Sequence, residues 1–153
     1  MGKLRFTIGG DGSIGISGGG GAYVDLGAMI RLDIGTSNHV CLDYLCSIAE
    51  VEAGVIEFGE HDGEVYETLI EKEGVTVTHH FIPNRSSEYS FSEFRETIES
   101  LWKTIYGLRS APHIIRDYRP DLSEADASLV GWEEYWKKPH PYRGRIEGVP
   151  AAG

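Results

Sequence analysis

The sequence predicts an α+β domain, in which an antiparallel sheet of five to seven strands is backed by one long capped helix, with a shorter C-terminal helix. Three observations predict this class. Short apolar segments separated by glycine-rich turns fill the first half of the chain, a helical apolar stripe follows a capping signal at Ser90, and an aromatic helical pattern begins near Ser123. We assign residues 1–138 to a single domain and residues 139–153 to an extended tail that contains proline and glycine.

Glycine punctuates the beginning of the chain, where 11 of the 20 glycines fall within the first 35 residues. Because glycine adopts positive φ angles without steric cost, these glycines indicate turns between short strands. In the longest of these segments, apolar side chains alternate from Val24 to Ile34, a pattern typical of a strand. Strands are therefore expected at residues 3–8, 13–17, 22–34 and 39–46.

The segment from Gly10 to Gly15 matches the G-x-G-x-x-G pattern of dinucleotide-binding loops. A dinucleotide site needs a helix that opens at the third glycine, but Gly18 and Gly19 follow only three residues later. The segment therefore predicts a hairpin turn.

Residues 55–82 are expected to form a meander with strands at residues 55–58, 64–71 and 75–82. A two-residue loop at Glu73 and Gly74 places Ile70 opposite Val77 and gathers the apolar residues on one face, whereas a three-residue loop would set them opposite glutamates. The expected inner face comprises Ile56, Phe58, Tyr66, Thr68, Ile70, Val77, His79 and Phe81. The expected outer face comprises Val55, Glu57, Val65, Glu67, Leu69, Glu71, Thr76, Thr78 and His80.

Two helices follow the meander. Ser90 and Glu93 form a capping-box pattern, and apolar residues then recur at helical spacing as far as Ile105. A second helix is expected over residues 123–138, capped by Asp121 or Ser123, with an aromatic side. The first of these helices would cover one face of the sheet.

The net charge of −10 is concentrated in less than a quarter of the chain. Between Cys41 and Val75 there are ten carboxylates and one base, Lys72, so this segment carries nine of the ten net negative charges. Such a field attracts a basic partner and repels nucleic acid and anionic membranes. The sequence therefore predicts an acidic surface that binds neither nucleic acid nor membrane.

No motif for catalysis, a cofactor or a metal accompanies this charge. Cys41 and Cys46 are spaced neither as a zinc knuckle nor as a redox pair, and we expect two buried thiols in a cytoplasmic protein. His79 and His80 are adjacent on a strand, so they point to opposite faces and cannot chelate one metal together. His61, flanked by Glu60 and Asp62, more closely fits a solvated turn than a cation site.

These observations favour a protein-binding module without catalytic activity, which uses the acidic meander face to bind and occlude a basic protein partner. A nuclease-type toxin is one such partner, because a site that binds phosphates must be basic. In architecture and charge the chain resembles the small acidic immunity proteins of bacterial toxin systems, a likeness of class that assigns no residues. From the charge pattern we expect the partner-binding residues to be Glu57, Glu60, Asp62, Glu64, Glu67, Glu71 and His80.

Two other classes of function remain open on the sequence. A small enzyme or ligand-binding domain could place its site in a sheet–helix cleft near Tyr66, His79 and Trp102. A structural or assembly subunit could use the glycine-rich N-terminus and the C-terminal tail as docking arms. A deep polar pocket would favour the first, and a homo-oligomer built through the N-terminal strands would favour the second.

Overall fold

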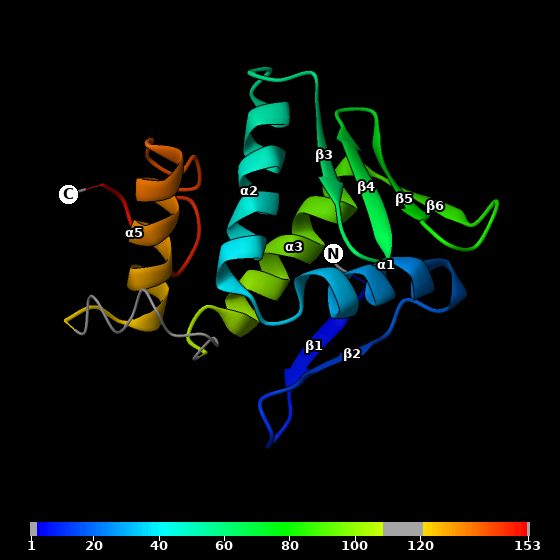
Figure 1. Cartoon of the computed structure of the whole chain (residues 1–153), viewed down its shortest axis with the longest axis horizontal. Coiled ribbons are helices and arrows are strands. Elements are labelled where there is room, and N and C mark those ends of the chain that lie inside the picture. The colour runs from blue at the N-terminus through cyan, green and yellow to red at the C-terminus, as the bar shows by residue number, and fades with distance from the viewer. Residues whose placement is uncertain (1–2, 109–120, 153) are drawn as a thin grey trace.

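The computed structural model describes residues 3–108 and 121–152, and its α+β class agrees with the sequence. Within these residues the strands form two antiparallel sheets rather than one of five to seven strands, and two helices, not one, are long (Figure 1). The small sheet pairs β1 (Arg5–Ile8) with β2 (Ile14–Ser17). The larger sheet has the order β3-β4-β5-β6.

The turn between β1 and β2 coincides with the G-x-G-x-x-G segment, as expected for a hairpin. Asp11 stabilises this turn, because its carboxylate accepts hydrogen bonds from the backbone N–H and the hydroxyl of Ser13. Gly12 has a φ of 83°, a conformation that glycine adopts without strain.

The predictions of strands at residues 22–34 and 39–46 are wrong, because both segments are helical. The first comprises η1 (Gly21–Tyr23), α1 (Val24–Met29) and η2 (Ile30–Ile34), and the second is α2 (Asn38–Glu52). In the first segment Leu26, Met29, Ile30 and Ile34 are buried at three- and four-residue spacing. Two other residues of the alternating pattern, Val24 and Leu32, are more than half exposed.

In the larger sheet, β4 (Tyr66–Glu71) and β5 (Gly74–His79) are joined by a turn at Lys72 and Glu73. Ile70 therefore faces Val75 and not Val77, a shift of two residues from the expected register. Because side chains alternate with a period of two, this shift leaves each residue on its expected face. Tyr66, Thr68, Ile70 and Val77 are buried on the inner face as predicted. A fourth strand, β6 (Ser86–Tyr89), was not expected.

The edge strand β3 (Phe58–Asp62) occupies the segment that was expected to be a turn. Gly59 faces Ile70 and lies against α2, where an added Cβ would be 2.9 Å from the Cβ of Ser47. Glycine is thus required here for close packing of strand against helix, rather than for a turn. This placement reverses the expected faces of β3, so that Phe58 points outward and is half exposed.

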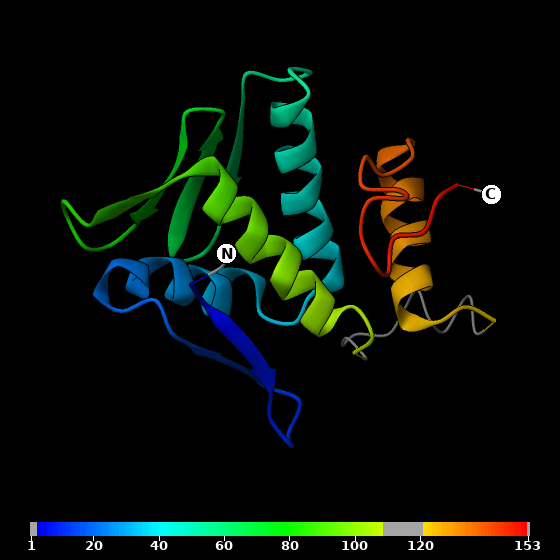
Figure 2. The ribbon, with the colours of Figure 1, turned by 180° about the vertical axis from the view of Figure 1, so that it is seen from behind.

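The helices α2 and α3 (Phe91–Ile105) cover one face of this sheet, and α5 (Glu124–Trp136) packs on the far side of α2 (Figures 1 and 2). The N-cap serines of both helices are confirmed, whereas the Glu93 carboxylate of the capping-box pattern accepts from the Tyr23 hydroxyl. The hydroxyl of Ser90 accepts from the N–H of Glu93, and that of Ser123 from the N–H of Asp126. None of the helices in the described residues is long and apolar enough to cross a membrane.

Residues 139–152 form turns, as their prolines and glycines indicate, but they do not extend away from the domain. His140, Tyr142 and Val149 are buried. Gly148 passes so close to Tyr106 that an added Cβ would be 2.6 Å from its ring, and the Trp102 indole donates to the carbonyl of Glu147. Arg143 forms an ion pair with Glu133 of α5 and Arg145 one with Glu52 of α2, so this segment is fixed to three helices.

Candidate functional site

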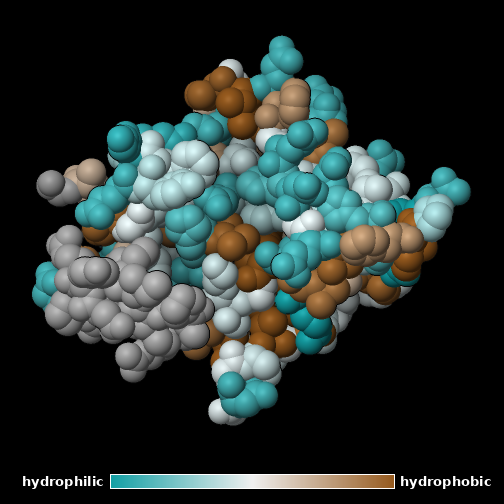
Figure 3. Space-filling view, viewed as in Figure 1, coloured by the Kyte–Doolittle hydropathy of each residue, from teal (hydrophilic) through white to brown (hydrophobic). Residues whose placement is uncertain are grey.

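The outer face of the larger sheet carries five carboxylates. The strand register places Glu60 and Asp62 of β3 beside Glu67 and Glu71 of β4 on the face opposite the helices, and Glu88 of β6 lies on the same face. In the view of Figure 3, hydrophilic residues cover β3 and β4. We call the set Glu60, Asp62, Glu67, Glu71 and Glu88 the acidic face.

The acidic face is almost devoid of neutralising cations. Among the described residues, Glu60, Glu67, Glu71 and Glu88 form no ion pair. Asp62 stands directly opposite Glu67 across the two strands. Like charges in such a position lower the stability of a sheet.

His80 contacts a carboxylate of the acidic face. Its Nε2 atom lies 2.7 Å from a carboxylate oxygen of Asp62 and 3.0 Å from the carbonyl oxygen of Gly63. The contact is an ion pair only when the His80 ring is protonated.

The two other predicted partner-binding residues lie beside the acidic face. Glu57 immediately precedes β3, and Glu64 lies in the turn between β3 and β4. Both are exposed. The structure thus brings Glu60, Asp62, Glu67 and Glu71 onto one face and leaves Glu57 and Glu64 at its ends.

Exposed apolar side chains flank the acidic face at both ends. Val55 and Phe58 lie at the end where β3 begins, with Phe58 50% exposed. Phe81 (74% exposed) and Ile82 lie in the loop at the opposite end. A charged centre with apolar margins provides both steering and burial for a protein partner.

A shallow hollow of about 410 Å³ lies at the edge of this face, between the β4–β5 turn and β6. Glu71, Glu73 and Glu88 line it together with Thr76. Its chemistry suits a basic side chain.

The three carboxylates of α2 contributed to the charge count but do not belong to the acidic face. Asp43 accepts a hydrogen bond of 2.7 Å from the indole of Trp132, and Glu50 accepts one from Lys138. Glu52 pairs with Arg95 and Arg145, and these cations lower its pKa although desolvation opposes them. These charges are used within the fold.

A second pocket, of about 300 Å³, lies between α2, β3 and α5 and was not anticipated from the sequence. His61 of β3 faces into the fold here, stacked on Tyr44 at 4.0 Å between ring centroids, with its Nε2 atom 2.8 Å from the Ser47 hydroxyl. Burial lowers the pKa of His61 to about 4, so the ring is neutral at pH 7. No third residue in the described part of the chain hydrogen-bonds to the other ring nitrogen, so this pair lacks the orienting group of a catalytic triad.

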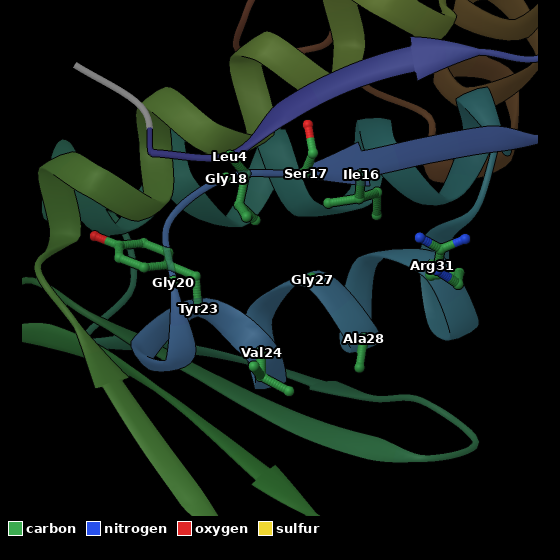
Figure 4. Close-up of a pocket in the computed structure, with 10 residues that line it drawn as sticks. All are labelled: Leu4, Ile16, Ser17, Gly18, Gly20, Tyr23, Val24, Gly27, Ala28 and Arg31. Carbon is green, nitrogen blue, oxygen red and sulfur yellow. The ribbon is translucent and has the colours of Figure 1, made fainter.

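A further cavity, of about 290 Å³, lies between the β1–β2 hairpin and α1 (Figure 4). Leu4, Ile16 and the glycines near residue 18 line one side, and Tyr23, Val24 and Ala28 the other. Arg31, at one end, is the charged residue of this lining and contacts the Ile14 carbonyl.

The polar groups of Tyr66, His79 and Trp102, considered above as an alternative site, are occupied within the fold. The Tyr66 hydroxyl donates to Asp25, and the buried indole of Trp102 donates to Glu147. Nδ1 of His79 accepts from the N–H groups of Phe81 and Ile82. In the described residues, no three His, Cys, Asp or Glu side chains are placed to hold a metal ion.

Comparisons with protein-family models, with curated proteins and with solved structures find no match for this chain.

Proposed function

We propose that the protein is a binding module that docks a basic protein partner against the acidic face. The observation that carries the proposal is the placement of Asp62 directly opposite Glu67, amid further carboxylates that have no cation partner among the described residues. In the free protein these charges repel one another, and a basic partner would remove that cost on binding.

The apolar margins support the same function. Phe58 and Phe81 are large exposed side chains that a partner spanning the sheet would cover. Aromatic residues of this kind contribute strongly to affinity when they become buried, whereas exposed charges mainly set association rate and specificity. A site that binds phosphates has the basic charge that this description requires, and a nuclease-type toxin inhibited by occlusion of its basic site is the example that we favour.

The test begins with capture of the partner from the native host, followed by measurement of association and dissociation rates. We expect Glu60→Lys/Glu67→Lys/Glu71→Lys to weaken binding at least a hundredfold, mainly by slowing association. For the wild type, the association rate should fall steeply between low and physiological salt, where the Debye length shortens to about 8 Å.

Matched single variants separate the acidic face from net charge. Glu67→Lys and Glu134→Lys change the charge equally, but Glu134 is exposed on α5, away from the acidic face. Only Glu67→Lys should slow association markedly. Normal binding by the triple variant at both salt concentrations would show that the acidic face is not the interface.

A further inference from the structure

The pocket between α2, β3 and α5 combines carboxylates with aromatic walls. Its lining includes Asp43, Glu50 and Glu60, the rings of Trp132 and Trp136, and one cation, Lys138. Carboxylates and indole faces both attract organic cations, the first by charge and the second through the ring quadrupole.

The two tryptophans differ in how firmly they are held. Trp132 is 1% exposed, and its indole N–H is fixed by Asp43. Trp136 is 49% exposed, and its ring centroid lies 6.2 Å from that of Trp132. Trp132 is thus a fixed wall of the pocket, whereas Trp136 is a partly exposed wall that a bound cation would cover.

One cation of the protein already lies in these surroundings. The Lys138 ammonium group donates to Glu50 at 2.9 Å and lies 5.9 Å from the centroid of Trp132. It leaves Glu60 without an ion-pair partner among the described residues. His61 adds no positive charge, because its buried ring is neutral at pH 7.

We propose that this pocket receives the guanidinium or ammonium group of an arginine or lysine side chain from the basic partner. The source of that side chain rests on the function proposed above, whereas the preference of the pocket for an organic cation does not. Glu60 belongs both to the acidic face and to the pocket lining, so one partner can reach the two together.

The cation preference is tested with Nα-acetyl-arginine methylamide as the probe and its neutral citrulline counterpart as the control. In ¹H–¹⁵N spectra, the arginine probe should shift the indole N–H signals of Trp132 and Trp136. The Trp102 signal should not move, since that indole is buried against Glu147. Absence of shifts at tens of millimolar probe, or equal shifts with citrulline, would overturn the proposal.

Two matched pairs of variants locate the site. Trp136→Ala should weaken probe binding about tenfold, whereas Tyr135→Ala, which removes a neighbouring exposed aromatic ring outside the lining, should not. Glu60→Gln should weaken it and Glu64→Gln should not. Equal effects within either pair would contradict the assignment of the pocket.

The partner itself tests the source of the cation. Trp136→Ala should accelerate dissociation of the captured partner at least tenfold relative to Tyr135→Ala. If the probe binds but the partner dissociates equally from both variants, the pocket takes a free cation and the assignment to a partner side chain is wrong. If the triple acidic-face variant binds the partner normally, the docking function is refuted. Probe binding to the wild-type protein would still identify the pocket as a site for organic cations.

Discussion

Carboxylates that face inward and carboxylates of the acidic face behave as two different populations in this molecule. Asp25, Asp43 and Glu52 each accept hydrogen bonds from fixed donors on other elements. Glu67 and Glu71 have no such donors among the described residues. A charge count along the chain therefore overstates the field at the surface, because part of the charge holds the fold together.

The inward population is exemplified by Asp25, which joins α1 to the sheet. Its carboxylate accepts from the Tyr66 hydroxyl at 3.0 Å, from Arg85 at 2.8 Å and from the Ser87 hydroxyl at 2.6 Å. Together these donors lower the pKa of Asp25, although desolvation acts in the opposite direction.

The largest expected effect is therefore that of Asp25→Ala. Removing this buried acceptor leaves three donors without a partner and should lower the free energy of unfolding by about 4 kcal/mol. Denaturant unfolding measures the change. A loss below about 1 kcal/mol would place Asp25 with the exposed carboxylates and remove the distinction drawn here.

Lowering the pH should reduce the free energy of unfolding, because His61, which packs beside α2, becomes protonated. Its pKa is about 4 in the folded protein against 6.5 when exposed, so the neutral form is favoured by folding. This stability is fully present above pH 6.5 and is lost as the pH falls toward 4, by about 3 kcal/mol.

The control is His61→Phe, which should lose less stability than the wild type over the same pH interval. Protonation of the acidic face is common to both proteins and cancels in the difference. Stability is measured by urea unfolding at pH 7, 5.5 and 4. Equal losses of stability in the wild type and in His61→Phe would mean that folding does not lower the pKa of His61.

An intermediate loss of stability is expected at Glu52, another of the inward-facing carboxylates. Glu52→Gln weakens the contacts to Arg95 and Arg145, both partly exposed, so we expect a loss of about 1 kcal/mol that shrinks at high salt. Thermal unfolding at low and high salt measures it. Equal stability of variant and wild type at low salt would show that these ion pairs contribute nothing.

The sheet and the helices differ in how far the sequence predicts them. Local capping signals located α3 and α5, because Ser90 and Ser123 satisfy the first N–H groups of a helix wherever it packs. Helix α2 was missed although Ser37 caps it in the same way, accepting from the N–H of Val40. Its apolar residues are buried on most sides, so no single stripe shows its period.

The segment of α1 was missed for another reason. Apolar residues stand at every second position from Val24 to Ile34, and three of them, Leu26, Ile30 and Ile34, also lie at helical spacing. The strand and helix periods are distinguished only by the tertiary structure, in which Leu26 and Ile30 are buried.

The faces on which the carboxylates lie were predicted correctly in β4 but not in β3. Glu67 and Glu71 follow from alternation in β4, which survives a register shift of two residues. The position of Glu60 and His61 in a strand depends on the close approach of Gly59 to Ser47, a contact between segments that no local pattern reveals. For the same reason the pocket beside α5 could not be found from the sequence.

The smallest expected effect concerns the outward population and has the opposite sign. Glu67→Gln removes the repulsion between Glu67 and Asp62, which face each other across β3 and β4. The free protein should become more stable by about 0.5 kcal/mol, because like charges directly opposite one another destabilise a sheet. Thermal unfolding at low salt measures the gain, and it should disappear at 1 M salt, where the Debye length is about 3 Å. Glu64→Gln makes the same change of charge in the turn, outside the cross-strand pair, and should leave the stability nearly unchanged. If Glu67→Gln instead destabilises the protein in a way that salt does not alter, Glu67 contributes to the fold and belongs with the inward-facing carboxylates.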